Sequence, residues 1–226
     1  MKTRVPGILA CASLLTAITA LAAPPALAGV APAVSTDVTA GDIATLIAPD
    51  GSRKALPTTE HLQATTTGGV TQWSDTTVVS VRMNGNTVAP LNTSGGCEDD
   101  GSISVTSCLT QNWTQQTVNG LRYVAVQSYV SKWIRHDTTV AWSGATMTAA
   151  AFGPTTTSVF INKVETKSVG TPTSGASYTQ VPSWHSYWVL VQGSQHYQCG
   201  TNHINLAHGS RHWVLDHTHV CQGSQD

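Results

Sequence analysis

Residues 121–130 read LRYVAVQSYV, and this stretch decides the fold class. Apolar and polar side chains exchange along it with a period of two, which is typical of a strand that buries one face. Asn119-Gly120, directly before it, is a pair of turn-forming residues. The sequence therefore predicts a strand that is entered from a turn.

Shorter runs of the same kind occur on both sides of this stretch, at residues 77–83, 158–164, 187–192, 203–206 and 212–216. Gly, Pro, Asn and Ser separate them, and the sequence contains no convincing amphipathic helix of ten or more residues. Many short strands at nearly regular spacing predict an all-β fold, an antiparallel β-sandwich or barrel.

The first 28 residues have the pattern of a secretory signal peptide. Lys2 and Arg4 precede an apolar run, and small residues occupy the −3 and −1 positions before a cut between Ala28 and Gly29. No later run approaches the roughly 18 apolar residues of a membrane span. We expect a secreted, extracellular protein with no membrane insertion after signal removal.

Residues 29–69 differ from the rest of the chain, because they contain three prolines and neither Trp nor Cys. This composition predicts a loosely ordered linker or pro-region. A first strand docked on the sheet is the competing possibility. The all-β domain is expected to span residues 70–226.

Five cysteines are present, and Cys11 is lost with the signal. Cys97, Cys108, Cys199 and Cys221 remain, an even number that suits an oxidising compartment. Four cysteines allow three pairings. We favour Cys97–Cys108 and Cys199–Cys221, because each pair brackets a plausible hairpin, so that two disulfides would staple the domain.

The charge balance argues against two classes of partner. The chain has 11 Lys and Arg residues against 12 Asp and Glu residues, and two of the basic residues belong to the signal. No basic excess is left to neutralise a phosphate backbone, so nucleic acid is not an expected partner. No basic cluster points to anionic lipid.

Histidines crowd the C-terminal part of the chain and suggest a metal site. If an antiparallel pair follows the register of a Cys199–Cys221 disulfide, His203 lies opposite His217, and His219 shares their face. Three imidazoles leave one position open on a zinc ion, as a catalytic site needs. Solvated or hydrogen-bonded structural histidines are the alternative, and a pH-responsive patch is another.

Tryptophan provides a second candidate site. On a strand, Trp184 and Trp188 would point the same way and could stack on sugar rings. Core packing is the alternative role for these side chains.

No catalytic motif for nucleophilic chemistry is present, so no catalytic residue is assigned and no cofactor is expected. The sequence predicts a secreted, non-catalytic binding or structural β-domain protein whose partner is a polysaccharide or another extracellular protein. The two alternatives are a zinc-dependent extracellular hydrolase that uses the three histidines and a carbohydrate-binding module.

Overall fold

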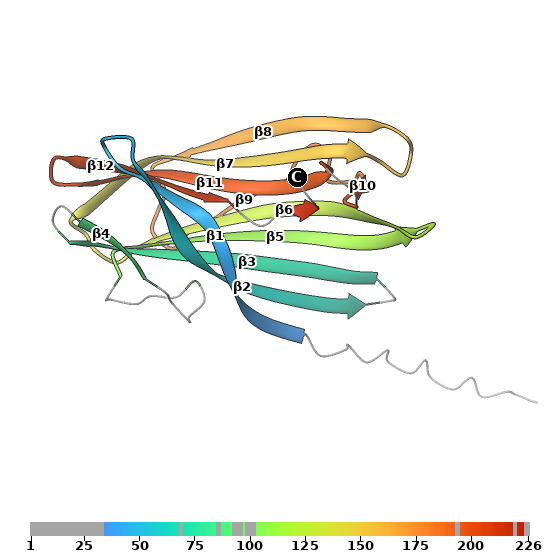
Figure 1. The fold of residues 1–226 in the computed structure, drawn as a ribbon, viewed down its shortest axis with the longest axis horizontal. Coiled ribbons are helices and arrows are strands. Elements are labelled where there is room, and N and C mark those ends of the chain that lie inside the picture. The colour runs from blue at the N-terminus through green and yellow to red at the C-terminus, as the bar shows by residue number, and fades with distance from the viewer. Residues whose placement is uncertain are drawn as a thin grey trace, which may run out of the picture.

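The protein is all-β, as predicted. The structure, a computed structural model, describes residues 34–67, 70–84, 87–91, 97, 103–192, 195–218 and 221–223. Within these ranges thirteen strands form one sheet, and no helix is present (Figure 1). The strands are β1 (Val34–Ile47), β2 (Arg53–Thr67), β3 (Val70–Asn84), β4 (Thr87–Leu91), β5 (Val105–Val118), β6 (Leu121–Arg135), β7 (Val140–Pro154), β8 (Phe160–Gly170), β9 (Ser177–Gln180), β10 (Val189–Leu190), β11 (Tyr197–His208), β12 (Arg211–Thr218) and β13 (Gln222–Gly223).

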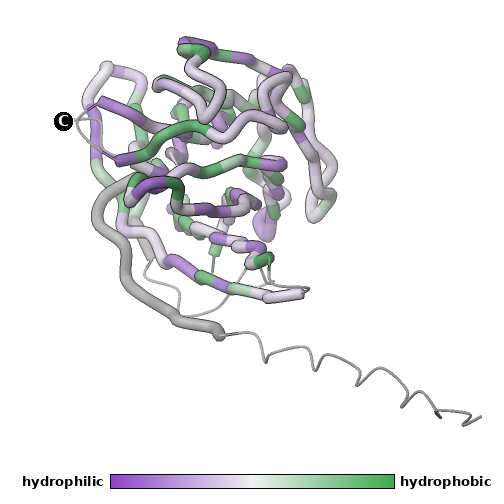
Figure 2. The backbone as a smooth tube through the Cα atoms, turned by 90° about the vertical axis from the view of Figure 1, so that its right-hand side faces the viewer, coloured by the Kyte–Doolittle hydropathy of each residue, from purple (hydrophilic) through white to green (hydrophobic). Residues whose placement is uncertain are grey.

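All strand pairs are antiparallel, and the sheet curls into a nearly closed barrel. The order of the main strands is β10-β6-β5-β3-β2-β1-β12-β11-β7-β8, with β4 on β3, β9 on β6 and β13 on β11. Figure 2 views this sheet nearly along the strands and shows them arranged around a common interior. A nearly closed sheet leaves few unpaired edges, which protects a strand-rich chain from pairing with other chains.

The two ends of the strand order meet through β9 and β10. Val189 of β10 pairs with Val124 of β6 and bridges to Thr155, just after β7. The Lys167 Nζ on β8 donates to the Thr179 carbonyl on β9 at 2.6 Å. The Gln180 Nε2, also on β9, donates to the Glu165 carbonyl on β8. Among the described strands, β8 and β9 are not paired through their backbones, so these side-chain bonds join the two strands at the seam.

Residues 34–67 correct the expected domain boundary, because they form β1 and β2 within the sheet. β2 pairs with β3 from Thr59 to Thr67, and β1 joins β2 to β12. The docked-strand alternative describes these residues, and the linker assignment is wrong for them. Their Pro and Thr content hid strands whose partners lie far along the chain.

The stretch that predicts the fold forms β6, but its alternation changes phase part-way. Asn112 of β5 pairs with Ser128 and Trp113 pairs with Val126, so Gln127 is an extra residue in a bulge. Val124 and Val126 face inward before the bulge, whereas Tyr129, Ser131 and Trp133 face inward after it, so the inward parity changes from even to odd. Asn119 and Gly120 both take positive φ, 52° and 78°, and make the preceding turn.

The barrel interior changes character along the strands. On β3 the side chains on the interior face are, in order, Trp73, Asp75, Thr77, Val79 and Val81. Val79 and Val81, near one end, belong to the hydrophobic core, and so does Trp113 beside Trp73. Thr77 lies in a polar zone at the middle, and Trp73 lies near the other end.

Both expected disulfides are present. Cys97 is bonded to Cys108, with the Cα atoms 6.0 Å apart, and Cys199 is bonded to Cys221, with the Cα atoms 4.4 Å apart. The first ties Cys97, which precedes β5 in the chain, to that strand. The second ties the start of β11 to the segment before β13.

Candidate binding site

The barrel opens at the end that holds Trp73, because its two walls separate there. β1 pairs with β12 only over Ala44–Ile47, whereas its first half pairs with β2 alone among the described strands. β2, β3, β5 and β6 continue as one wall, and β11 with β13 continues as the other. Side chains that face inward between these walls are therefore not fully covered.

A pair of stacked indoles lies on the first wall. Trp73 of β3 is paired with Trp113 of β5, and their ring centroids are 6.2 Å apart with planes inclined by 12°. Trp113 is only 4% exposed, whereas Trp73 is half-buried. The Gln127 bulge lies between the partners of Asn112 and Trp113, and bulges re-aim neighbouring side chains. Trp113 thus supports an indole that remains partly open.

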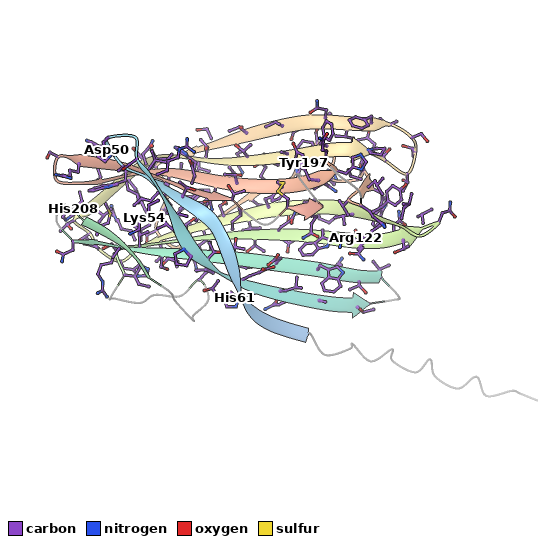
Figure 3. The ribbon with its side chains drawn as sticks, viewed as in Figure 1. Asp50, Lys54, His61, Arg122, Tyr197 and His208 are labelled. Atoms are coloured by element: carbon purple, nitrogen blue, oxygen red, sulfur yellow. A yellow bond between two sulfur atoms is a disulfide. The ribbon has the colours of Figure 1, made fainter. Side chains whose placement is uncertain are left out.

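A pocket of about 230 Å³ adjoins this pair, and we name it the end pocket. Besides the two indoles, its lining residues are Glu60, Leu62, Asp75, Gln115, Arg122 and Gln222. Arg122 lies at this end of the barrel, whereas Asp50 and His208 lie at the opposite end (Figure 3). Because Gln222 belongs to β13, the pocket lies between the separating walls.

The end pocket is polar and carries both signs of charge. Asp75 is 2% exposed and Glu60 is half-buried, so two carboxyl groups line a partly desolvated space. Arg122 adds one guanidinium, and its backbone N–H donates to the Gln192 Oε1 at 3.0 Å. No ion pair to this guanidinium is present among the described residues. The lining therefore offers hydrogen-bond acceptors, donors and an aromatic surface together.

A second hollow of about 260 Å³ lies over the same strands, and we name it the outer groove. Its neutral polar lining residues are Gln63, Thr65, Gln72, Ser74, Asn112 and Gln127. Gln72 and Ser74 flank Trp73 along β3, so their side chains project to the opposite face of the sheet. Trp73 and Trp113 line the outer groove as well, so the two hollows share the indole pair and differ in their polar residues.

Deeper in the barrel, a network of hydrogen bonds joins polar side chains across the interior. The His217 Nε2 lies 2.9 Å from the Thr77 Oγ1, and its Nδ1 lies 3.1 Å from the Ser107 Oγ. The Ser107 hydroxyl donates to the Asn202 Oδ1 at 3.0 Å, and the Asn202 amide donates to the Ser131 Oγ. All five side chains are fully buried.

This network contains a serine and a histidine in contact, but their hydrogen bonds do not suit nucleophilic catalysis. Because the Ser107 proton is directed to Asn202, the hydroxyl accepts from the His217 Nδ1–H rather than giving that nitrogen its proton. A catalytic pair needs the opposite direction and access for a substrate. The network instead links β3 and β5 to β11 and β12 across the interior.

Gln111 and Tyr129 lie beside this network. The Gln111 Nε2 donates to the Tyr129 hydroxyl at 3.2 Å and to the Gln198 carbonyl at 3.3 Å. Burial raises the pKa of Tyr129 well above its ordinary value, because the phenolate would lose its hydration. Gln111 is paired with Asp75 of the end pocket, so these side chains lie between the pocket and the polar zone.

The expected histidine register is wrong. β11 and β12 pair His203 with Asp216 and Asn202 with His217. A one-residue slip moves a side chain to the other face, so His203 and His217 project to opposite sides of the sheet. The His203 Nδ1 lies 2.6 Å from the Asp216 Oδ1, and both side chains are 33% exposed.

The register on β11 differs between its two partners. Gln198 pairs with Gln222 of β13 in the register expected from the disulfide, whereas Thr201 pairs with Thr218 of β12 one residue out of that register. His219 falls outside the described residues. Within the described ranges, no group of three His, Cys, Asp or Glu side chains is placed to hold a metal ion.

The expected tryptophan platform is also absent, because residues 181–188 form turns rather than a strand. Trp184 is fully buried in the core, and Trp188 is half-buried. The cleavage site at Ala28 and Gly29 falls outside the described residues.

The stacked Trp73–Trp113 pair was not anticipated from the sequence. Both residues occupy inward-facing positions in the alternation along their strands, and this alternation can be read from the sequence. The pairing of β3 with β5, which brings the two indoles together, cannot be read from it. Compared with known proteins, the chain matches no family model, no curated protein and no solved structure. The described residues include no helix that could span a membrane. Functional inference therefore rests on the site itself.

Proposed function

We propose that this chain is a secreted, non-catalytic binding protein that holds a small ligand in the end pocket. The observation that carries the proposal is the combination of a stacked indole pair, two carboxyl groups and a guanidinium around one space of about 230 Å³. A concave space with an aromatic surface and a few convergent polar groups is the usual form of a ligand site.

Secretion is supported by the N-terminal pattern and by the two disulfides, which suit an oxidising compartment. We propose cleavage after Ala28, because β1 begins at Val34 and the whole sheet then stays in the mature chain. Removal of residues 29–69 would take away β1 and β2 and leave β3 and β12 with unpaired edges. Mass analysis of the secreted product tests this: a mature N-terminus near residue 70 would contradict it.

Ligand binding is tested by thermal shift and Trp fluorescence of the secreted protein against soluble sugars, amines, amino acids, phosphate and fatty acids. A ligand at a hundred times its Kd stabilises the fold by about 2.7 kcal/mol, which a melting curve detects readily. Trp73→Leu should abolish the shift. Trp188→Leu is the matched control, because it removes another half-buried indole that lies outside the end pocket. Equal loss in both variants, or no shift with any probe, would refute the proposal.

A further inference from the structure

We infer that the end pocket takes one pyranose ring of an extracellular carbohydrate, stacked on Trp73. This inference rests on the proposed function and specifies its ligand class. It places the site at Trp73, on β3, and not at the tryptophans between β9 and β10.

The size of the pocket limits the ligand to about one ring. Pockets for drug-sized ligands typically enclose about 300–1,000 Å³. The end pocket, at about 230 Å³, lies below this range. Gln111 and Tyr129 are buried behind it, so it does not continue into the barrel.

The polar lining matches hydroxyl groups better than it matches an ion. Glu60 and Asp75 accept hydrogen bonds, Arg122 donates them, and the amides of Gln115 and Gln222 do both. A hydroxyl also does both, so a ring that carries several hydroxyls can use every one of these groups. A phosphate is an anion and would face two carboxyl groups. An ammonium only donates and would face the guanidinium.

The aromatic surface of the end pocket is the second feature that favours a sugar ring. A pyranose ring has C–H groups on its faces, and these pack on the π face of an indole. Trp113 holds Trp73 from behind, with planes inclined by only 12°, so the platform is ordered before the ligand arrives. Leu62 is the one aliphatic side chain in the lining, which is too little apolar surface for an acyl chain.

The test is titration of the secreted protein by calorimetry and saturation-transfer NMR with glucose, galactose, mannose, xylose and N-acetylglucosamine. Tryptamine, inorganic phosphate and octanoate are the non-sugar probes. Trp73→Leu and Arg122→Gln should each weaken sugar binding about tenfold or more, since hydrogen bonds to charged groups and aromatic contacts are of that order. Arg122 lies next to the β5–β6 turn, so we expect Arg122→Gln to fold. This variant tests the site even if Trp73→Leu does not fold.

Gln72→Ala is the matched control, because Gln72 adjoins Trp73 along β3 but lines only the outer groove. Sugar binding that is lost in Trp73→Leu and Arg122→Gln and kept in Gln72→Ala supports the inference. Because Trp73 also lines the outer groove, loss in Trp73→Leu and Gln72→Ala with binding kept in Arg122→Gln would place the sugar there and overturn the inference. Saturable binding of a non-sugar probe alone, dependent on Trp73, would overturn the sugar class and leave the proposed function standing. Binding of none of the probes would overturn both.

Discussion

Gly200→Ala should destabilise the barrel through a single contact with Tyr129. Gly200 lies in β11, with its backbone outside the left-handed region, so alanine causes no backbone strain there. A Cβ at this position would fall 2.5 Å from the Tyr129 Cε1 and closer still to Cδ1. Ordinary carbon contacts are about 3.5–4.0 Å, so the ring would have to move by about 1 Å.

The magnitude follows from two opposing terms. Tyr129 is 1% exposed and its hydroxyl is bonded to Gln111, so the ring has little freedom to move, and overpacking should cost close to the usual upper value of about 3 kcal/mol. Alanine is favoured over glycine in a strand by about 0.5–1 kcal/mol. We expect a net loss of about 2 kcal/mol, which lowers Tm by about 4–8 °C for a domain of this size.

A second background separates the ring contact from other causes. In Tyr129→Val the ring is gone, and Gly200→Ala should then become stabilising by about 0.5–1 kcal/mol, because only the strand preference remains. Urea unfolding at 25 °C, followed by Trp fluorescence with the disulfides intact, measures all four proteins. A loss of the same size in both backgrounds would refute the assignment of the effect to Tyr129.

Burial holds the pKa of Tyr129 above its ordinary value of 10.0, so the native state keeps the phenol proton that the unfolded chain releases above pH 10. The free energy of unfolding should not depend on this group below pH 10 and should fall by about 1.4 kcal/mol per pH unit above it. Urea midpoints measured between pH 9 and 11 should fall less in Tyr129→Phe than in the unmodified protein. Hydrogen bonds from Ser183 hold the pKa of Glu165 below its ordinary value of 4.5, so this contact stabilises the seam above that pH and weakens as the pH falls below it. Glu165→Ala should lower the exchange protection of the Ser183 amide at neutral pH, and unchanged protection would contradict the role. Replacing Cys97 and Cys108 together by serine should cost about 3 kcal/mol, because the bond closes a loop with a sequence separation of 11, and an unchanged urea midpoint would rule this out.

Local patterns in the chain were sufficient for the class of fold. The alternation at 121–130 predicted a strand, and Asn119-Gly120 predicted its turn, because both signals depend on neighbouring residues only. Each disulfide closes a short loop, so the favoured pairing was accessible for the same reason.

The pairing register of strands that lie far apart in the chain could not be predicted from the sequence. The disulfide pattern predicted His203 opposite His217, but β11 and β12 pair one residue out of that register, so Asp216 lies there instead. Gln127 shows the same effect in β6, where an extra residue reverses which parity faces inward. Period-two patterns give the spacing of side chains on a face, and they do not reveal where a bulge changes that face.

By itself, the sequence predicted the all-β class and favoured, without deciding, the two disulfide pairs that the structure contains; the export signal stays a prediction. Only the tertiary structure decided that residues 34–67 are sheet strands, that Trp184 is core and that Trp73 stacks on Trp113. The physical reason is that strand pairing joins segments far apart in the chain. Which inward side chains then become neighbours depends on the closure of the whole barrel.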